Sequence, residues 1–209
     1  MIKLNGVFKS FGNTSAVDNV SCVIENPGVT VIMGPSGSGK TTFLRLIAGL
    51  EAPAKGEIFI DGKLVSSARF LMPAHKRGIG FVFQVPALWP HMTVKQNIAF
   101  GVTGRIDERV DFLIKATGLS GLAGRFPDEL SGGQARRVSF CRAVAAKPKY
   151  LLLDEPFVNL DRTLKKQMLG FLKDPAVCVA LHIIYVTHDI EEAAEASSVV
   201  MNFDNGRLQ

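Results

Sequence analysis

Two glycine-rich stretches of this sequence contain the residue types that bind phosphate groups. Residues 34–41 read GPSGSGKT, and residues 130–134 read LSGGQ. The first stretch matches the pattern GxxxxGK[ST], in which backbone N–H groups surround a phosphate and the lysine contacts it. In the second, Ser131 precedes two glycines at the start of an apolar-periodic segment, as is typical of a helix that begins with a serine cap. The sequence therefore offers two candidate phosphate sites.

The first stretch has the flanking elements that a phosphate-binding loop requires. The apolar run VTVIM precedes it, and the helical segment TTFLRLIAGL follows it. We expect Lys40 to reach the β- and γ-phosphates, the Thr41 hydroxyl to bind Mg²⁺, and Thr42 to add a phosphate contact. A chance glycine-rich turn is the alternative, and the strand–loop–helix setting argues against it. The predicted nucleotide-binding residues here are Gly34, Pro35, Ser36, Gly37, Ser38, Gly39, Lys40, Thr41 and Thr42.

A third stretch with residues that could do chemistry is the apolar run YLLLDEP at residues 150–156, which includes two adjacent carboxylates. A buried strand needs a reason to end this way, because each carboxylate must be paired or solvated. Beside a phosphate-binding loop, Asp154 would hold Mg²⁺ and Glu155 would polarise an attacking water. A solvated strand end is the alternative. No Asn-Lys-x-Asp motif for guanine is present, which favours ATP over GTP.

Composition limits the classes of protein to consider. The 209 residues are 47% hydrophobic and 21% charged, with a net charge of +5, which fits one α/β domain with room for a subdomain. The sequence contains no run of five basic residues, which argues against nucleic-acid binding. Three separated cysteines without a CxxC pair argue against zinc and for a reducing compartment. No apolar run approaches a membrane span, and the start lacks a signal peptide, so we expect a cytosolic protein.

The elements that must position these residues alternate along the chain. Runs such as LLLD and IIYVT are apolar throughout, which predicts parallel strands buried on both faces. The early strands, separated by the turn signals at 26–28 and 61–62, predict an antiparallel edge layer. The expected strands are 2–8, 18–24, 29–33, 57–60, 79–83, 150–154, 182–187 and 199–203. The first expected helix begins after Lys40. The other expected helices cover about 107–117, 131–147, 162–173 and 189–197.

Between Phe83 and Leu130 the strand pattern stops, and one amphipathic helix, IDERVDFLIKATGL, stands out. We interpret residues 85–135 as a helical subdomain inserted into an ATP-binding core formed by residues 1–84 and 136–209. Together they make one α/β domain with a mainly parallel sheet. His75, His91 and His182 have no partner at ligand spacing, and we expect surface or packing roles for them. Cys141 and Cys178 lie in apolar stretches and are expected in the core.

The motifs occur in a fixed order: Phe11, the loop at 34–41, Gln84, LSGGQ, LLLDEP at 151–156, NLD at 159–161 and VTHD at 186–189. In this order and spacing the chain resembles the nucleotide-binding subunit of ATP-binding cassette (ABC) transporters over essentially its whole length. The resemblance implies the P-loop ABC-ATPase fold, ATP and Mg²⁺ as cofactors, and ATP hydrolysis as the activity. It implies Lys40, Gln84, Glu155 and His188 as catalytic residues, and Thr41, Gln84 and Asp154 as Mg²⁺ ligands.

The resemblance also assigns roles that the residues alone do not. Phe11 would stack on adenine, where the family usually has tyrosine; a core position on an edge strand is the alternative. Val17 would pack on the base or simply on the sheet. Gln84 would touch Mg²⁺ and the attacking water, and His188 would bond the γ-phosphate.

The second phosphate site is redundant in a single subunit that already has a P-loop. The resemblance resolves this by a head-to-tail dimer, either a homodimer or a pair with a related second ATPase subunit. The signature of each subunit, formed by Ser131, Gly132, Gly133 and Gln134, would then cover the ATP held by the other. Asp161 would lie near the dimer axis and contact both sites.

An ATPase without a membrane span must act on a partner. The stretch VPALWPHMTVKQNIAF at 85–100 resembles the region that docks a transmembrane permease subunit, with Trp89 in a hydrophobic groove; local packing of Trp89 is the alternative. The sequence FPDELSGGQ resembles the signature region of bacterial importer subunits. The chain would then lie peripherally at the cytoplasmic face of the inner or plasma membrane. A solute-binding protein would be an indirect partner, and the cargo an inorganic ion, a polyamine or thiamine.

Other classes of ATPase share some of these motifs. A soluble, translation-type cassette would normally carry two cassettes in one chain. An exporter or lipoprotein-release ATPase is a further alternative within the family. Chromosome ATPases insert long coiled coils between the two halves, for which the span from Gln84 to Leu130 is too short. A small-molecule kinase shares the P-loop but has no use for LSGGQ.

Overall fold

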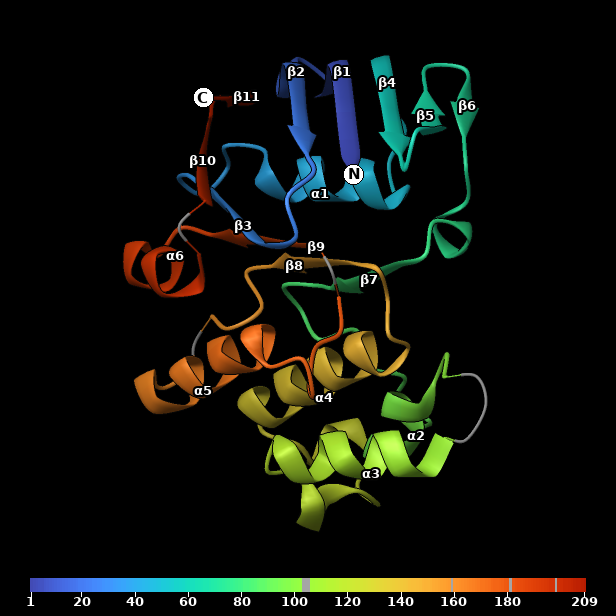
Figure 1. Cartoon of the computed structure of the whole chain (residues 1–209), viewed down its shortest axis with the longest axis vertical. Helices are drawn as coiled ribbons and strands as arrows, with labels where there is room; N and C mark the ends of the chain where they lie inside the picture. The colour runs from blue at the N-terminus through green and yellow to red at the C-terminus, as the bar shows by residue number, and fades with distance from the viewer. Residues whose placement is uncertain (103–105, 159, 181, 198) are drawn as a thin grey trace. The chain divides into compact units, whose positions relative to one another are not determined.

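The computed structural model describes residues 1–102, 106–158, 160–180, 182–197 and 199–209. The chain forms two compact units (Figure 1). The first comprises Met1–Ile79 and Leu181–Gln209, and the second comprises Gly80–Ala180. The predicted helical subdomain, 85–135, lies inside the second unit, and its status as a separate subdomain stays a prediction.

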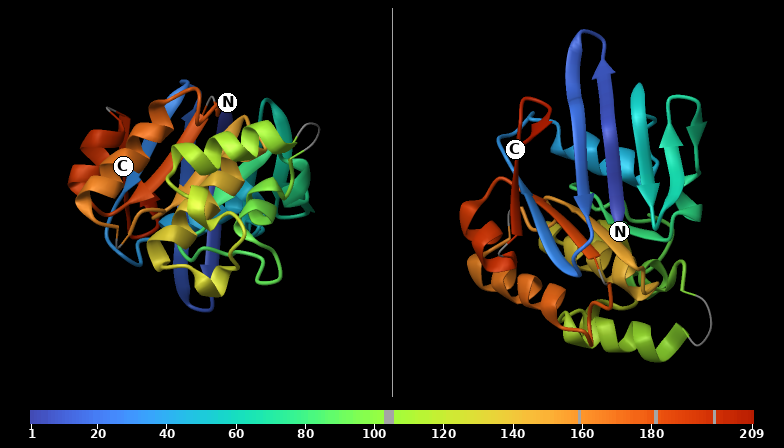
Figure 2. Two further views of the ribbon diagram at one scale, coloured as in Figure 1. Left: turned by 90° about the horizontal axis from the view of Figure 1, so that it is seen from below. Right: turned by 45° about the horizontal axis from the view of Figure 1, so that its top comes forward.

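The first unit contains a five-stranded sheet in which all neighbouring strands are antiparallel (Figure 2). Its order is β2-β1-β4-β5-β6. The antiparallel layer predicted from the early strands is confirmed. The short strands β5 and β6 were not predicted, because they do not alternate over enough residues. The bounds are β1 (Ile2–Phe11), β2 (Thr14–Ile24), β4 (Lys55–Ile60), β5 (Lys63–Ser67) and β6 (Phe70–Leu71).

The second group of strands in the first unit follows the order β11-β10-β3-β9. Strand β3 (Gly28–Met33) pairs in parallel with both β10 (Val199–Asp204) and β9 (His182–Thr187). Every residue of β9 is buried, which is why its sequence is apolar rather than alternating. The short β11 (Arg207–Leu208) pairs antiparallel to β10. Helices α1 (Lys40–Ala48) and α6 (Ile190–Ala196) complete this unit.

Arg77 is a buried cation that joins α1 to the antiparallel sheet of the first unit. It follows a short 3-10 turn at Ala74–Lys76 and is 6% exposed. Its Nη1 donates to the carbonyls of Leu46 and Ile47 at the end of α1, at 3.2 and 2.8 Å. Its Nη2 and Nε donate to three acceptors on β5 and directly after β6: the Val65 carbonyl, the Ser66 hydroxyl and the Met72 carbonyl. Burial lowers the pKa of Arg77 to about 10, so the group stays charged at pH 7.

The second unit contains two neighbouring strands and most of the helices. The strands are β7 (Ile79–Val82) and β8 (Tyr150–Asp154), and β8 is buried throughout. Helix α2 was not predicted, because it has six residues and lies among prolines and loop residues. The helices are α2 (Val94–Ala99), α3 (Ile106–Ala116), α4 (Gly132–Ala145) and α5 (Arg162–Lys173), with 3-10 turns at Ser120–Leu122 and Pro127–Glu129.

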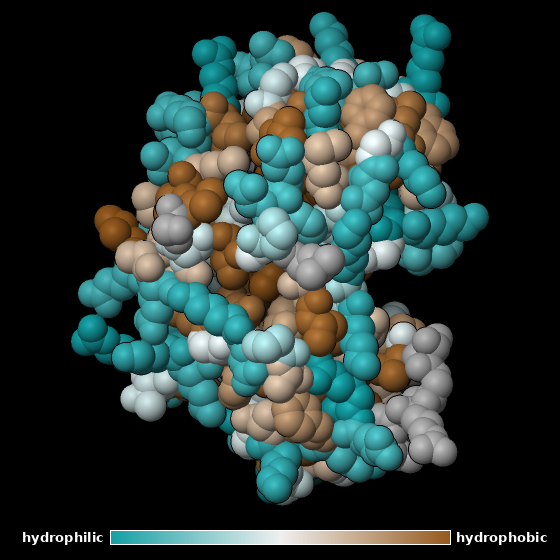
Figure 3. Space-filling view, viewed as in Figure 1, coloured by the Kyte–Doolittle hydropathy of each residue, from teal (hydrophilic) through white to brown (hydrophobic). Residues whose placement is uncertain are grey.

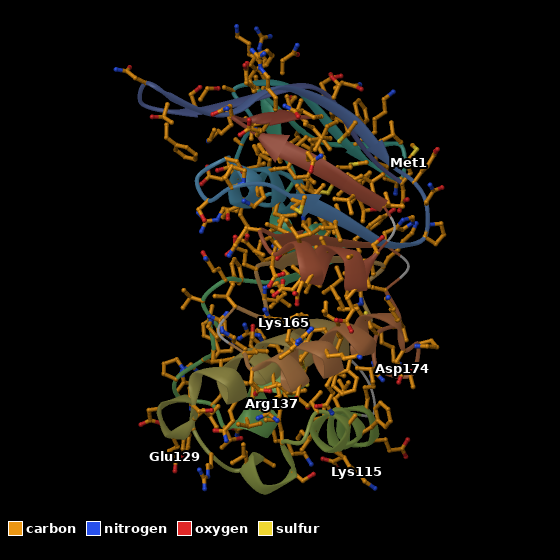
Figure 4. All side chains as sticks on the ribbon, turned by 90° about the vertical axis from the view of Figure 1, so that its left-hand side faces the viewer. Met1, Lys115, Glu129, Arg137, Lys165 and Asp174 are labelled. Atoms are coloured by element: carbon orange, nitrogen blue, oxygen red, sulfur yellow. The ribbon has the colours of Figure 1, made fainter. Side chains whose placement is uncertain are left out.

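Helix α4 is the central element of the second unit. Its residues Val138, Phe140 and Cys141 are fully buried, and the Phe140 and Phe157 rings meet edge-on at 6.2 Å. Arg137, labelled in Figure 4, donates from Nη1 to the Thr117 carbonyl at 2.9 Å after the end of α3. The helix therefore has an apolar face towards the core and arginines that bond neighbouring backbone.

The three cysteines are free thiols with little access to solvent. Cys141 and Cys178 are buried, as expected from their apolar surroundings, and Cys22 is half-buried. Burial raises the pKa of Cys22 and of Cys141 to about 12, and it also raises the pKa of Cys178. All three thiols therefore stay protonated at neutral pH.

The surface is mainly polar on the face that Figure 3 shows, with apolar side chains in smaller groups between the hydrophilic ones. Within the described ranges, no helix combines the length and the apolar character needed to cross a membrane.

Candidate functional site

The loop at residues 34–39 connects β3 to α1 in the first unit. The Ser38 N–H donates to the Pro35 carbonyl at 3.2 Å, and Gly37 and Gly39 have φ angles of +80° and +108°. Helix α1 begins after Gly39 without a side-chain cap, whereas α2, α4, α5 and α6 are capped by side chains of Thr93, Ser131, Asp161 and Asp189. A helix start carries N–H donors without intrahelical partners, which an anion can cap.

Lys40 lies with its ammonium group inside this loop. Its Nζ donates to the carbonyls of Gly34 and Pro35, each at 2.7 Å, and lies 3.4 Å from the Ser38 hydroxyl. The side chain is 4% exposed. A buried ammonium needs such acceptors, and phosphate oxygens of a nucleotide are of the same kind but carry charge. The residue is therefore positioned for the role predicted from the motif.

Two of the loop glycines are required by close backbone neighbours. A Cβ on Gly34 would lie 1.9 Å from the Phe203 carbonyl oxygen, and one on Gly39 would lie 1.9 Å from the Ala16 carbonyl oxygen. Of these three loop glycines, Gly37 differs: its Cβ position is open, and its positive φ is the reason for a glycine there. We had attributed all of these glycines to phosphate access. For Gly34 and Gly39 the structure adds a second reason, the packing of the loop against β10 and β2.

The turn between β10 and β11 holds the loop from the other side. The Gly206 N–H donates to the Ser38 carbonyl at 2.9 Å, and the Gly206 carbonyl accepts from the Asp18 N–H at 2.7 Å. Arg207 forms an ion pair with Asp18 at 2.7 Å. The P-loop is thus tied to β2 through the end of the chain, a support that no motif in the sequence indicated.

The two kinds of glycine predict different losses of stability. We expect Gly37→Ala to lower the free energy of unfolding by about 1–2 kcal/mol, the cost of a left-handed alanine. Gly39→Ala adds a clash with the Ala16 carbonyl and should cost about 2–4 kcal/mol. Urea denaturation measures both. Gly170→Ala is the control, because Gly170 lies within α5 with open space at its Cβ and the change should stabilise by up to about 1 kcal/mol. Equal losses at Gly37 and Gly39 would contradict the packing argument.

His188 follows β9 directly, and strand pairing brings it to the P-loop. Met33 and Thr187 are paired in the parallel register of β3 and β9, so Gly34 and His188 are the next residues of two adjacent strands. The strand expected at 182–187 has these bounds in the structure, and His188, the residue after it, is exposed. The ring is therefore on the same edge of the sheet as the phosphate-binding loop.

The two residues predicted to contact adenine differ in exposure. Phe11 ends β1 with its ring 50% exposed, and Lys9 Nζ lies 5.0 Å from the ring centroid. A core position for Phe11 is therefore wrong, and stacking of its exposed ring on adenine stays a prediction. Val17 is fully buried in β2, which favours packing on the sheet; its contact with a base stays a prediction.

The remaining histidines take the surface or packing roles expected of them. His75 and His91 are exposed, and His182 is buried with Nδ1 3.2 Å from the Asn26 carbonyl oxygen.

The second unit holds the predicted carboxylates. Asp154 is the last residue of β8 and is 3% exposed. Glu155 follows it with φ +43°, a left-handed conformation that non-glycine residues rarely adopt. Such strain is found where a side chain must be aimed in a set direction. Gln84 Nε2 donates to Glu155 Oε2 at 3.3 Å, so the structure brings these two predicted catalytic residues together.

Gln84 lies outside a strand rather than at the end of one. Strand β7 ends at Val82, two residues before Gln84 and one residue before the end of the strand expected at 79–83. Two arginines of α4 hold the segment instead: Arg136 donates to the Gln84 carbonyl at 2.8 Å and Arg142 to the Ala87 carbonyl at 2.7 Å. Burial lowers the pKa of both guanidinium groups. We did not predict these positioning residues, and their signal is a pair of arginines on a largely apolar helix.

The LSGGQ stretch begins α4 as predicted, with Ser131 as the N-cap. The Ser131 hydroxyl accepts from the Gln134 N–H at 3.3 Å, and the Gln134 side-chain oxygen accepts from the Ser131 N–H at 2.9 Å. This capping box uses the serine oxygen as an acceptor and leaves its hydrogen for an external acceptor. Gly132 has open space at its Cβ position, whereas a Cβ on Gly133 would lie 3.2 Å from Leu160. The helix start is therefore small and accessible.

Asp161 caps α5, its carboxylate accepting from the Leu164 N–H at 2.9 Å. This gives the residue a role inside its own subunit, and its contact across a dimer stays a prediction. The preceding motif residue, at 159, lies outside the described residues.

Each unit offers an oxygen donor of the kind that Mg²⁺ prefers. In the first unit Thr41 carries a hydroxyl directly after Lys40, and in the second unit Asp154 carries a buried carboxylate. The described residues contain no group of three or more His, Cys, Asp or Glu that could hold a metal ion. The loop of residues 34–39 supplies backbone donors for the phosphates.

A surface hollow lies beside α2 in the second unit. It has a volume of about 400 Å³ and is lined by His91, Met92, Gln96, Ala99 and Phe100. Trp89 and Phe100 meet at 5.3 Å between ring centroids and are 42% and 49% exposed. The buried Asn97 side chain holds the loop by bonding Trp89 at its N–H and its carbonyl.

The strand–loop–helix at residues 28–48 and the two carboxylates at the end of β8, Asp154 and Glu155, define a P-loop nucleotide-binding protein. The family model described as ABC transporter matches residues 17–158, and the chain belongs to this family. The α/β P-loop ABC fold is confirmed by solved structures. The dimeric structure of MJ0796, a bacterial ABC transporter cassette, aligns with a TM-score of 0.88 at 31% identity, covering 100% of this chain and 97% of that chain.

Curated relatives match the whole chain. A sulfate/thiosulfate import ATP-binding protein CysA of Synechocystis is 41% identical over 100% of this chain and 59% of its own length. A probable protein of the same name from Chlorella vulgaris is 40% identical, over 99% of this chain and 89% of its length. A spermidine/putrescine import ATP-binding protein PotA of Bacteroides fragilis is 41% identical over 100% of this chain and 46% of its own length. The chain spans about three fifths of the length of the first of these relatives.

Proposed function

We propose that this chain is the ATP-hydrolysing motor subunit of an ABC importer and that it works as a head-to-tail dimer with a second copy or a related ATPase subunit. One observation carries the proposal: the P-loop helix α1 begins without a side-chain cap, while a second accessible helix start at Ser131 belongs to the other unit of the same chain. Similarity over the whole chain to import ATP-binding proteins supports the importer type.

Each residue of the site has a role in this proposal. Lys40 and the loop N–H groups bind the β- and γ-phosphates of ATP, and Thr41, Asp154 and Gln84 hold Mg²⁺, which neutralises phosphate charge. Glu155 orients and polarises the attacking water. His188 donates to the γ-phosphate as charge develops there.

The signature completes the site in trans. Ser131, Gly132, Gly133 and Gln134 present a helix start whose serine hydrogen can bond a γ-phosphate oxygen of the partner's ATP. Asp161 lies near the dimer axis in this arrangement. A single subunit then binds ATP but hydrolyses it poorly, because half of each site belongs to the partner.

We expect Ser131→Arg to slow ATP hydrolysis by the assembled complex strongly while the affinity of a single subunit for ATP is unchanged. The long cation fills the accessible helix start and the γ-phosphate contact is lost, a loss of on the order of 10²–10³ in rate. Steady-state hydrolysis and equilibrium binding of a fluorescent ATP analogue measure the two effects.

Ser131→Thr is the matched control, since it keeps the hydroxyl cap and should retain most of the hydrolysis. Ser131→Ala removes both functions of the hydroxyl, the cap, at a cost of about 1 kcal/mol of stability, and the hydrogen bond in trans. Unchanged hydrolysis by the arginine variant would refute the trans assignment.

The aromatic hollow beside α2, within residues 85–100, is the proposed docking site for a transmembrane permease subunit. Its volume of about 400 Å³, its exposed Phe100 and the exposed Trp89 ring in contact with Phe100 suit an apolar helix of the partner. We propose residues 85–135 as the helical subdomain that carries this contact, and residues 1–84 and 136–209 as the ATP-binding core.

The proposed location is peripheral, at the cytoplasmic face of the inner or plasma membrane, held there by the permease. A solute-binding protein is an indirect partner, and nucleic acid is not a partner. The cargo belongs to the partners; relatives named for sulfate/thiosulfate and spermidine/putrescine support an inorganic ion or a polyamine. The soluble translation-type and exporter or lipoprotein-release alternatives are not favoured by these relatives.

A further inference from the structure

Glu192 is a buried carboxylate that the proposed chemistry does not use. It lies in α6 and is 4% exposed. Its Oε2 accepts two short hydrogen bonds, from the Tyr185 hydroxyl at 2.6 Å and the Thr187 hydroxyl at 2.7 Å. Glutamate is rarely buried without partners, and bonds from hydroxyl groups to a carboxylate are among the stronger kinds. The side chain is thus held firmly against β9.

The bonds of Glu192 converge on the residues that flank His188 (α6 and β9 in Figure 1). Thr187 donates to Glu192 and also accepts from the Asp189 N–H at 3.1 Å. The Asp189 carboxylate in turn accepts from the N–H groups of Glu191 and Glu192. The backbone before and after His188 is therefore fixed by one network that has Glu192 at its centre.

The network is rigid because both of its supports are anchored in the sheet. Tyr185 is fully buried and pairs with Val31 in the register of β3 and β9. At the other end of α6, the Ser197 hydroxyl bonds the Val29 carbonyl of β3 and accepts from the Val199 N–H at 2.9 Å. Strand β3 leads into the P-loop, so the helix that carries Glu192 is fixed to the same strand as the phosphate site.

We propose that Glu192 is a positioning residue of the hydrolytic site: through Thr187 and Asp189 it sets the place of His188 beside the P-loop. The role of His188 in hydrolysis is taken from the proposed function, and the inference about Glu192 rests on it. It differs from a purely structural role, in which Glu192 would stabilise α6 and affect hydrolysis only through general stability.

The first test measures, without nucleotide, how firmly the backbone on either side of His188 is held. Nuclear magnetic resonance order parameters of the His188 and Asp189 backbone amides are compared in the wild type, Glu192→Ala and Glu192→Gln. We expect Glu192→Ala to lower both values from about 0.85 towards 0.6 or below. Glu192→Gln should keep them near the wild-type values, since its amide oxygen can accept both hydroxyl bonds. Glu195→Ala, an exposed position of the same helix, is the control.

The second test is a double-mutant cycle on ATP hydrolysis by the assembled complex. Glu192→Ala should lower kcat about 10- to 100-fold with the ATP affinity unchanged, because small misplacements of a catalytic group have effects of this size. In a His188→Ala background the same change should have no further effect. If Glu192→Ala does not fold, Thr187→Val removes the linking hydroxyl while keeping the branched shape.

Three outcomes are decisive. Unchanged order parameters in Glu192→Ala would overturn the proposal, as would an equal loss of rate with and without His188. If His188→Ala itself left hydrolysis unchanged, the proposed function of His188 would fail, and the order parameters alone would still show whether Glu192 positions it.

Discussion

The Glu155→Gln variant should bind ATP, form a stable dimer and hydrolyse ATP 10²- to 10³-fold more slowly than the wild type. The amide keeps the shape of the side chain but cannot polarise the attacking water, and losing one positioned group typically has an effect of this order. The strained φ of +43° at Glu155 and its contact with Gln84 at 3.3 Å indicate that the side chain is aimed. Size-exclusion chromatography with Mg-ATP and steady-state hydrolysis measure both effects.

The control is Glu108→Gln, a carboxylate-to-amide change at an exposed position of α3, which should leave both properties unchanged. Full turnover in Glu155→Gln would remove Glu155 from the role of base. A variant that hydrolyses slowly but stays monomeric with ATP would separate Glu155 from the dimer hypothesis.

Arg77→Met should cause the largest loss of stability among the changes considered, about 3–5 kcal/mol of unfolding free energy. Methionine fills a similar length but removes the guanidinium donor from the Ile47 and Met72 carbonyls and from the Ser66 hydroxyl. The Leu46 and Val65 carbonyls lose one donor and keep a backbone N–H each. Each buried acceptor left unpaired costs about 1–3 kcal/mol, and these costs are not fully additive. Urea denaturation should show a lower midpoint with an unchanged slope.

Arg69→Met, at an exposed position between β5 and β6, is the matched control and should change stability by less than about 0.5 kcal/mol. Arg77→Lys should lie between the two, because a single ammonium cannot reach all the acceptors of a guanidinium. A loss below about 1 kcal/mol for Arg77→Met would show that water replaces the guanidinium at this position.

Much of the fold was predictable because the sequence carries local signals for it. The apolar run at 182–187 predicted a strand buried on both faces, and β9 is that strand. Ser131 before two glycines predicted a helix cap, and the capping box with Gln134 confirms it. The P-loop was predictable from its own residues together with the strand before it. These features depend on neighbours in sequence.

What the sequence did not reveal depends on contacts between distant residues. The reasons for Gly34 and Gly39 lie in carbonyls of Phe203 and Ala16, far along the chain. The support of Gln84 by Arg136 is likewise a contact between distant segments. Strand β7 stops at Val82, one residue before the end of the apolar run at 79–83.

The three protonated thiols make the chain suitable for site-specific labelling. Burial raises the pKa of Cys22 and Cys141 to about 12, so little of the thiolate with which maleimides react is present at neutral pH. A cysteine introduced at an exposed position would react far faster than the native three. Spectroscopic probes of ATP-driven motion can therefore be attached to the natural sequence, without a cysteine-free background that would disturb the core around Cys141.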